Sequence, residues 1–224
     1  MKGLLSYDSP LMTMARGVGN TMFINILFLL SCLPVVTIGA AWTALFAASR
    51  VLIEDGPCIR TYCKSFLASL KRATPAWLIL LPCLLLSVWA ALLVWRLRMA
   101  GMPLGQMSLV VSVVAIILVL AVITMTFLFY SRFECTLGQL LKNGIYMTIG
   151  YLFRAVIIAL VCWLPFFALF LNTELFMRGF VVCLCLYFGI AGGMAAWLMK
   201  KPLNRLVEGF LERETKDEEE LTTV

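Results

Sequence analysis

The chain contains no histidine among its 224 residues. A Ser-His-Asp triad and a His-Glu-x-x-His zinc helix both need this side chain, so neither site is possible here. The sequence also lacks a glycine-rich loop followed by lysine, which excludes a P-loop ATPase. These absences predict a protein that is not an enzyme and that binds no cofactor or metal.

Charged residues are also scarce, at 13% of the chain, whereas a soluble domain carries about 25%. No Asp or Glu falls inside any of the long apolar runs. Because proton- or cation-coupled pumps need carboxylates within the membrane, secondary active transport by this chain alone is not expected. The net charge of +6 comes from Lys and Arg that flank the apolar runs. We therefore expect no nucleic acid as a partner.

Apolar residues, in contrast, make up 62% of the chain. About 20 consecutive apolar residues cross a hydrocarbon core some 30 Å thick. The sequence therefore predicts an all-α, polytopic transmembrane helical bundle in the plasma membrane, with the lipid bilayer as its first partner. The predicted spans are residues 18–33, 40–53, 75–95, 108–130, 151–171 and 179–199. They belong to a single transmembrane domain over residues 1–202.

The first long apolar run, Leu27 to Leu45, contains a helix break at Pro34, Thr37 and Gly39. If the break is a turn at the far membrane face, the chain has six spans and both termini are cytoplasmic. If it is only a kink, residues 18–52 form one long tilted helix and there are five spans. The distribution of Lys and Arg favours six, and the C-terminus is cytoplasmic in either case. Transporters place substrate sites at such breaks, whereas the simpler role is a tight structural turn.

Two amphipathic stretches between the spans are predicted to be cytoplasmic helices. We expect their apolar stripes to form a docking surface for a partner. The stripe residues are Ile59, Tyr62, Phe66 and Leu70 in the first stretch and Leu137 and Leu141 in the second. Residues 203–224 are predicted to form a short cytoplasmic amphipathic segment and then a disordered acidic tail.

Four polar residues near the apolar runs are candidate functional residues. Arg132 and Glu134 lie at the inner end of a span, where ionisable residues are paired, functional, or interfacial anchors. Asn25 is the strong hydrogen-bonding side chain of the first span, which predicts a contact between helices. Asn143, in the second amphipathic stretch, is a candidate for capping or cross-linking helices.

Several sequence blocks resemble the YesL family, small membrane proteins of Gram-positive bacteria with a domain of unknown function. The blocks are LPVVTIGAAWTAL (Leu33 to Leu45), Glu54-Asp55-Gly56, SFLASLKRAT (Ser65 to Thr74) and SRFECTLGQLLKNGI (Ser131 to Ile145). The resemblance covers roughly residues 15–205, and Ala40 stands where the family pattern has proline. It implies a link to sugar uptake, since members are often encoded beside carbohydrate ABC-importer permeases and glycan-degrading enzymes. No chemistry is established for the family.

Together these features favour a non-catalytic membrane protein that is an accessory or regulatory partner of a carbohydrate ABC importer. The importer's permease subunits would dock on the amphipathic stripes. The alternative is a small transporter or channel that acts through the break at Pro34 to Gly39. The sequence names neither the sugar nor the oligomeric state.

Overall fold

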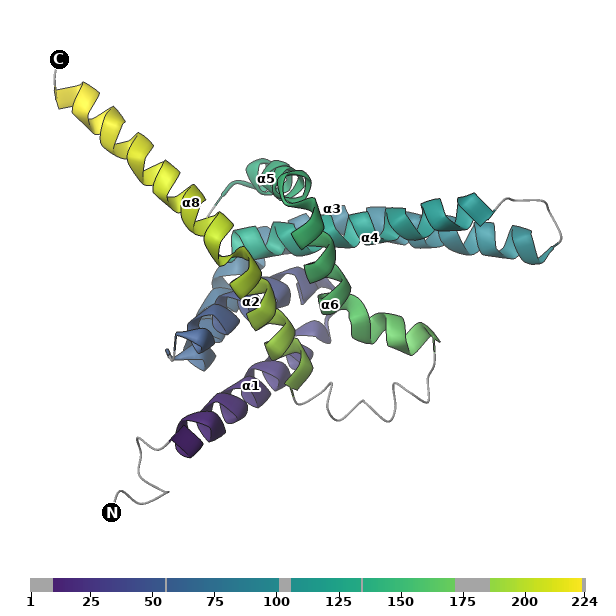
Figure 1. The fold of residues 1–224 in the computed structure, drawn as a ribbon, viewed down its shortest axis with the longest axis horizontal. Coiled ribbons are helices and arrows are strands. Elements are labelled where there is room, and N and C mark those ends of the chain that lie inside the picture. The colour runs from purple at the N-terminus through teal and green to yellow at the C-terminus, as the bar shows by residue number, and fades with distance from the viewer. Residues whose placement is uncertain (1–9, 55, 101–105, 134, 172–185, 223–224) are drawn as a thin grey trace.

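The computed structural model is all-helical wherever it describes the chain, which confirms the predicted fold class (Figure 1). The described residues are 10–54, 56–100, 106–133, 135–171 and 186–222. Within them lie α1 (Pro10–Cys32), the short 3-10 turn η1 (Val35–Thr37), α2 (Ile38–Ile53), α3 (Cys58–Met99), α4 (Gln106–Tyr130), α5 (Leu137–Gly150), α6 (Leu152–Leu171) and α8 (Phe188–Thr222).

The break in the first apolar run separates two antiparallel helices, α1 and α2. The rings of Phe28 and Trp42, one on each side of the break, lie 5.1 Å apart between centroids. Further from the break, Asn20 of α1 lines the same small cavity as Gly56, just beyond α2. The two helices therefore fold back on each other, which excludes the alternative of one long kinked helix.

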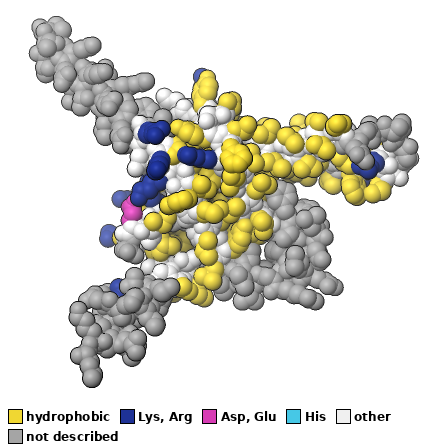
Figure 2. All heavy atoms as spheres, viewed as in Figure 1, with side chains coloured by type: hydrophobic (Ala, Val, Ile, Leu, Met, Phe, Trp, Pro, Cys, Tyr) yellow, Lys and Arg dark blue, Asp and Glu magenta, His cyan; other side chains and the backbone are white. Residues whose placement is uncertain are grey.

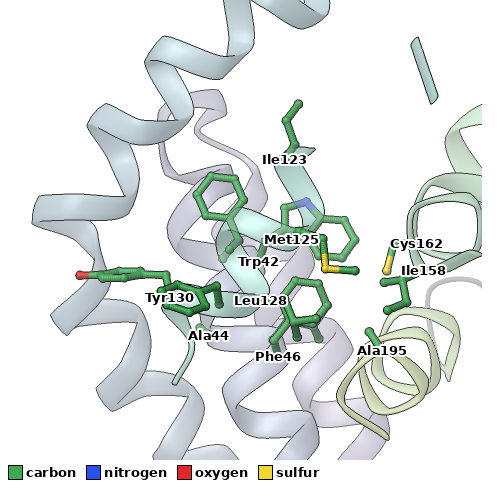
Figure 3. Close-up of a cluster of buried hydrophobic side chains, with 14 of the residues drawn as sticks. Trp42, Ala44, Phe46, Ile123, Met125, Leu128, Tyr130, Ile158, Cys162 and Ala195 are labelled. Carbon is green, nitrogen blue, oxygen red and sulfur yellow. The ribbon is translucent and has the colours of Figure 1, made fainter. Parts of the chain in front are cut away.

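Helix α2 is the centre of the bundle, and every residue from Gly39 to Ser49 is buried. Most of these residues are Gly, Ala or Ser, and such small side chains let neighbouring helices approach closely within a membrane. Figure 3 shows Trp42 and Phe46 of α2 in a cluster with buried side chains of α4, α6 and α8. At Gly192 of α8, an added Cβ would lie 2.6 Å from the Ser49 hydroxyl oxygen.

The turn between α1 and α2 packs against Ala73 and Trp77 of α3 and against Phe127, close to the C-terminal end of α4. A Cβ on Gly39 would lie 2.8 Å from Cβ of Trp77 and 2.9 Å from both the Ala73 carbonyl oxygen and the Phe127 ring. These neighbours mark the ends of spans 75–95 and 108–130 that the sequence assigns to the cytoplasmic side. The membrane side of the turn stays a prediction, and the structure shows that the turn packs against these span ends.

Helices α3 and α4 form a long arm that projects from the bundle (Figure 1). A helix of 42 residues, the length of α3, is about 63 Å long, roughly twice the hydrocarbon thickness. Hydrophobic side chains cover the arm, whereas Lys and Arg gather at the opposite side of the molecule and at the tip (Figure 2). Arg96 and Arg98 lie in the last turn of α3. This pattern matches an arm that crosses the lipid and ends at the outer surface.

Three helical segments of the described chain are long and apolar enough to cross a membrane. They are Val35–Ile53, Cys58–Met99 and Met107–Tyr130. The pair formed by α5 and the described start of α6 is bent by 107° and counts as a fourth if taken as one broken span. This bend confirms that the amphipathic stretch is separate from the helix after it. The apolar part of α1 is shorter, and predicted span 179–199 begins outside the described residues. The count of six spans therefore stays a prediction.

The C-terminal segment is helical as far as Thr222, because α8 continues through Pro202 without a break. The structure thus has a helix where the sequence predicts a disordered acidic tail. Glu, Lys, Arg and Leu, which dominate this segment, are strong helix formers. A low apolar content argues against a packed core but not against a helix.

We predict that Gly39→Ala destabilises the protein, because the new methyl group would overlap the Ala73 carbonyl oxygen. Overpacking of this kind costs about 1–3 kcal/mol. Gly138→Ala in α5 is the matched control, since nothing lies within 4 Å of its added Cβ. Thermal unfolding of both variants in dodecyl maltoside, followed by tryptophan fluorescence, measures the effect. Equal midpoints for the two variants would contradict this description of the turn.

Candidate functional site

The helix break is a closed turn whose backbone groups are satisfied by protein. The Thr37 hydroxyl donates toward the carbonyl oxygens of Ser31 and Pro34, at 2.6 and 2.8 Å. The indole N–H of Trp77 donates to the Val35 carbonyl oxygen at 2.8 Å. Because unpaired backbone groups are costly in lipid, these bonds explain how an apolar segment tolerates the break. The geometry matches a structural turn.

Trp77 is a residue whose role the sequence did not reveal. A tryptophan near a span end ordinarily anchors the protein at the membrane interface. Trp77 is instead 2% exposed, whereas Trp89 and Trp95, further along the same helix, are 61% and 52% exposed. Trp77 directly follows Lys71-Arg72-Ala73-Thr74-Pro75-Ala76 at the start of an apolar run, where an interfacial tryptophan is expected, so the local sequence gives no sign of its burial.

Asn25 joins α1 to the start of α8, as its position in the first span predicted. Its side chain is fully buried, and its Oδ1 accepts a hydrogen bond from the backbone N–H of Gly189 at 2.6 Å. Gly189 is the second residue of α8, so this bond joins α1 to the backbone of the first turn of α8. Its Nδ2 is buried and has no partner among the described residues.

Arg132 lies just beyond α4 and connects it to α8. Its guanidinium Nη1 donates to Oδ1 of Asn204 at 2.7 Å. Burial lowers the pKa of Arg132, and the positive charge of Arg50 lowers it further, while Glu54 opposes the shift. Glu134, the second candidate here, lies outside the described residues. The partner that the structure gives Arg132 is thus an amide rather than a carboxylate.

A cavity of about 330 Å³ opens beside Arg132, between α2, α3 and the end of α4. Its polar wall on α3 is formed by Ser65, Ser69 and Arg72, at positions i, i+4 and i+7. These spacings place the three residues on one helix face. This polar face lies beside the apolar stripe of the same helix, and its i, i+4, i+7 spacing is the signal by which the sequence could have predicted it.

The predicted docking stripes mostly face the protein's own core. Tyr62 is 1% exposed, and Ile59, at 37%, is the exposed member. The other four are partly buried and pack against the core: Phe66, Leu70, Leu137 and Leu141. Most of the predicted docking surface therefore packs within the chain itself, and docking of a partner at the parts left accessible stays a prediction. Periodicity shows which face of a helix is apolar, but not whether its partner belongs to the same chain.

A different apolar surface is exposed where α5 meets α6. We call it the corner surface, and its residues are Ile145, Tyr146, Ile149, Leu152 and Phe153, with 45% to 81% of each side chain exposed. The opposite face of α5 packs on α4, where an added Cβ on Gly144 would overlap the Thr126 side chain. Asn143 is partly buried in α5, and its side chain forms no hydrogen bond with another described residue.

Residues 21–90 match the model of a family described as protein of unknown function, DUF624. The match includes the helix break and the Ser65 to Thr74 block, and it ends before the Ser131 to Ile145 block. It is consistent with the resemblance drawn from the sequence. No curated protein and no solved structure matches the chain.

We predict that Asn25→Leu destabilises the protein, because it leaves the buried N–H of Gly189 without its acceptor. Losing one partner of a buried hydrogen bond costs about 1–3 kcal/mol. Asn143→Leu is the matched control, since this amide has no such bond to lose. Chemical unfolding in detergent compares the free energies of unfolding of the two variants. An Asn25→Leu protein as stable as the control would refute a stabilising role for the hydrogen bond between Asn25 and Gly189.

Proposed function

We propose that this chain is a non-catalytic integral membrane protein that acts as an accessory or regulatory partner of a carbohydrate ABC importer. The observation that supports it is the corner surface, an exposed apolar face formed by one side of α5 and the start of α6. The importer is suggested by the resemblance to the YesL family and its implied gene neighbourhood. The permease subunits are the expected partner.

The composition of the bundle interior supports a non-catalytic role. In the described part of the chain, no Asp, Glu, Lys or Arg is buried. Several buried hydroxyls bond to carbonyl oxygens one turn earlier in their own helices, as in Thr43 to Gly39 and Thr124 to Leu120. Such hydroxyls are satisfied locally, which leaves them structural rather than positioned toward a substrate.

The corner surface is suited to docking by its geometry. Helix α5 is fixed at its start by a capping box between Thr136 and Gln139. The bend of 107° sets α5 across the direction of α6, so α5 lies along the membrane surface if α6 spans it. Lys142 and Arg154 on these helices are typical of the cytoplasmic side. The surface therefore lies where the cytoplasmic segments of a neighbouring permease are within reach.

Transport through the helix break, the alternative function, has less support. Pro34, Thr37 and Gly39 form a closed turn, and neither cavity described above is lined by them. Solute flux in liposomes of purified protein would be the test of this alternative. Flux that Thr37→Ala abolishes would favour it over the accessory role.

We predict that Tyr146→Ser combined with Ile149→Ser releases the importer. The native tagged protein, purified in mild detergent from its own membranes, should carry permease subunits that mass spectrometry identifies. Loss of two exposed apolar anchors should reduce their yield by about tenfold, because few residues dominate most interfaces. Leu67→Ser is the matched control, since it removes an equally exposed apolar side chain (68%) from α3.

Two results would contradict this proposal in different ways. If the native protein is purified without importer subunits, the proposed partner is wrong. If the subunits stay bound to the double variant and the native protein alike, the corner surface is not the docking site.

A further inference from the structure

The cavity at the cytoplasmic end of α4 has a strongly basic wall. We call it the cationic pocket, and it is lined by the cations Lys71, Arg72 and Arg132 and by five hydroxyl-bearing side chains, Thr43, Ser65, Ser69, Tyr130 and Ser131. No acidic residue lines the pocket among the described residues. Three positive charges thus share one recess of about 330 Å³. This volume lies at the lower end of the range for small-molecule sites.

Among the described residues, positive charge outweighs negative charge around Arg132. Arg50 adds a fourth positive charge that acts on Arg132, and Glu54 is the described acid that opposes it. The pKa of Arg132 is lowered by burial as well as by this repulsion. Charges of one sign in a partly buried recess repel each other, and a bound anion offsets that repulsion.

Hydrogen-bond donors in the pocket are available for such an anion. Arg132 uses one N–H on Asn204, and a guanidinium has five. The hydroxyls of Ser65 and Ser69 form no hydrogen bond with any described residue, although Ser69 is only 5% exposed. Ser131 donates to the Leu128 carbonyl oxygen at 2.7 Å, and its oxygen can still accept. The pocket therefore combines unused hydroxyls with unpaired cations.

We propose that the cationic pocket is a binding site for a phosphate-bearing anion. Arg72 and Arg132 would bind the phosphate oxygens through paired N–H groups, with Lys71 as an additional charge and the serine hydroxyls as donors. Phosphate fits better than carboxylate, because three cations and two hydroxyls exceed what two oxygens can accept. The proposal does not depend on the importer partner.

Two sources can supply this chemistry at the cytoplasmic ends of the helices. One is the headgroup of an anionic phospholipid in the inner leaflet, since basic recesses between spans bind such headgroups. The other is a soluble phosphorylated metabolite. The pocket lies between the apolar arm and the cytoplasmic start of α3, so both sources have access to it.

The test is ligand-dependent thermal stabilisation of the full-length protein in dodecyl maltoside. The protein is first washed extensively with detergent, and residual lipid phosphorus is measured so that a retained lipid is not overlooked. Sodium phosphate and glycerol 3-phosphate are titrated at constant ionic strength against chloride. Dioctanoyl phosphatidylglycerol is titrated in parallel against dioctanoyl phosphatidylcholine. A ligand that binds the folded state raises the unfolding midpoint in proportion to occupancy.

We expect a saturable rise in the midpoint with at least one phosphate compound, and Arg72→Gln should weaken its apparent Kd by about tenfold. Lys64→Gln is the matched control, because it removes an exposed positive charge from the same helix outside the pocket wall. Asn204→Ala removes the hydrogen bond between Arg132 and α8 but keeps the positive charge of Arg132. This variant should still bind the phosphate compound. Ser65→Leu fills the recess without changing charge and should abolish binding even if the arginine variants do not fold.

Each outcome decides the proposal. Stabilisation by phosphate or glycerol 3-phosphate assigns the pocket to soluble compounds, and stabilisation by phosphatidylglycerol alone assigns it to a headgroup. No stabilisation of lipid-free protein by any of them overturns the proposal. Equal weakening by Lys64→Gln and Arg72→Gln also overturns it, because the effect would then be general surface charge.

Discussion

Close contact between α2 and its neighbours is the constraint on which the rest of the structure depends. Helices in lipid gain little from burying apolar surface, so their association depends on packing at short range. In α2, the run from Gly39 to Ser49 is buried on all sides, and at Gly192 of α8 there is no room for a Cβ beside Ser49. Larger side chains at these positions would separate the helices and leave the bundle without a centre.

The closed turn follows from the same constraint. Because Gly39 lies directly against Ala73, α3 brings Trp77 within hydrogen-bonding distance of the Val35 carbonyl oxygen. The break thus receives from α3 the donor that lipid cannot supply. A broken helix in a membrane protein is a strong pointer to a functional site when it lines a cavity. Here close packing has used the freed backbone groups to hold two helices in a hairpin, and the polar groups that stay unused lie in the cationic pocket between α2, α3 and the end of α4.

Much of this fold could be predicted, because the features involved are local in the sequence. The lengths of the apolar runs predicted the helices, and Pro34 and Gly39 predicted the break between α1 and α2. Asn25 was predicted to join helices because an amide in an apolar run needs a partner. The orientation of amphipathic faces was not predictable. The stripe through Tyr62 and Phe66 has the same periodicity whether it meets its own core or another protein. The depth of the turn and the burial of Trp77 likewise depend on which helices are neighbours, and no local pattern encodes that.

The positive-inside rule explains why the cationic pocket is basic. The rule places Lys and Arg at the cytoplasmic ends of spans to orient the protein, and these ends converge where α2, α3 and α4 pack together. The positive charge of Arg50 acts on Arg132, and this repulsion raises the free energy of the folded chain. The hydrogen bond from Arg132 to the amide oxygen of Asn204 offsets part of this repulsion. The amide carries no charge, so it does not neutralise the guanidinium. A residual positive potential in a recess lined by unused hydroxyls is the electrostatic condition for binding an anion, and here it arises from topology and close packing alone.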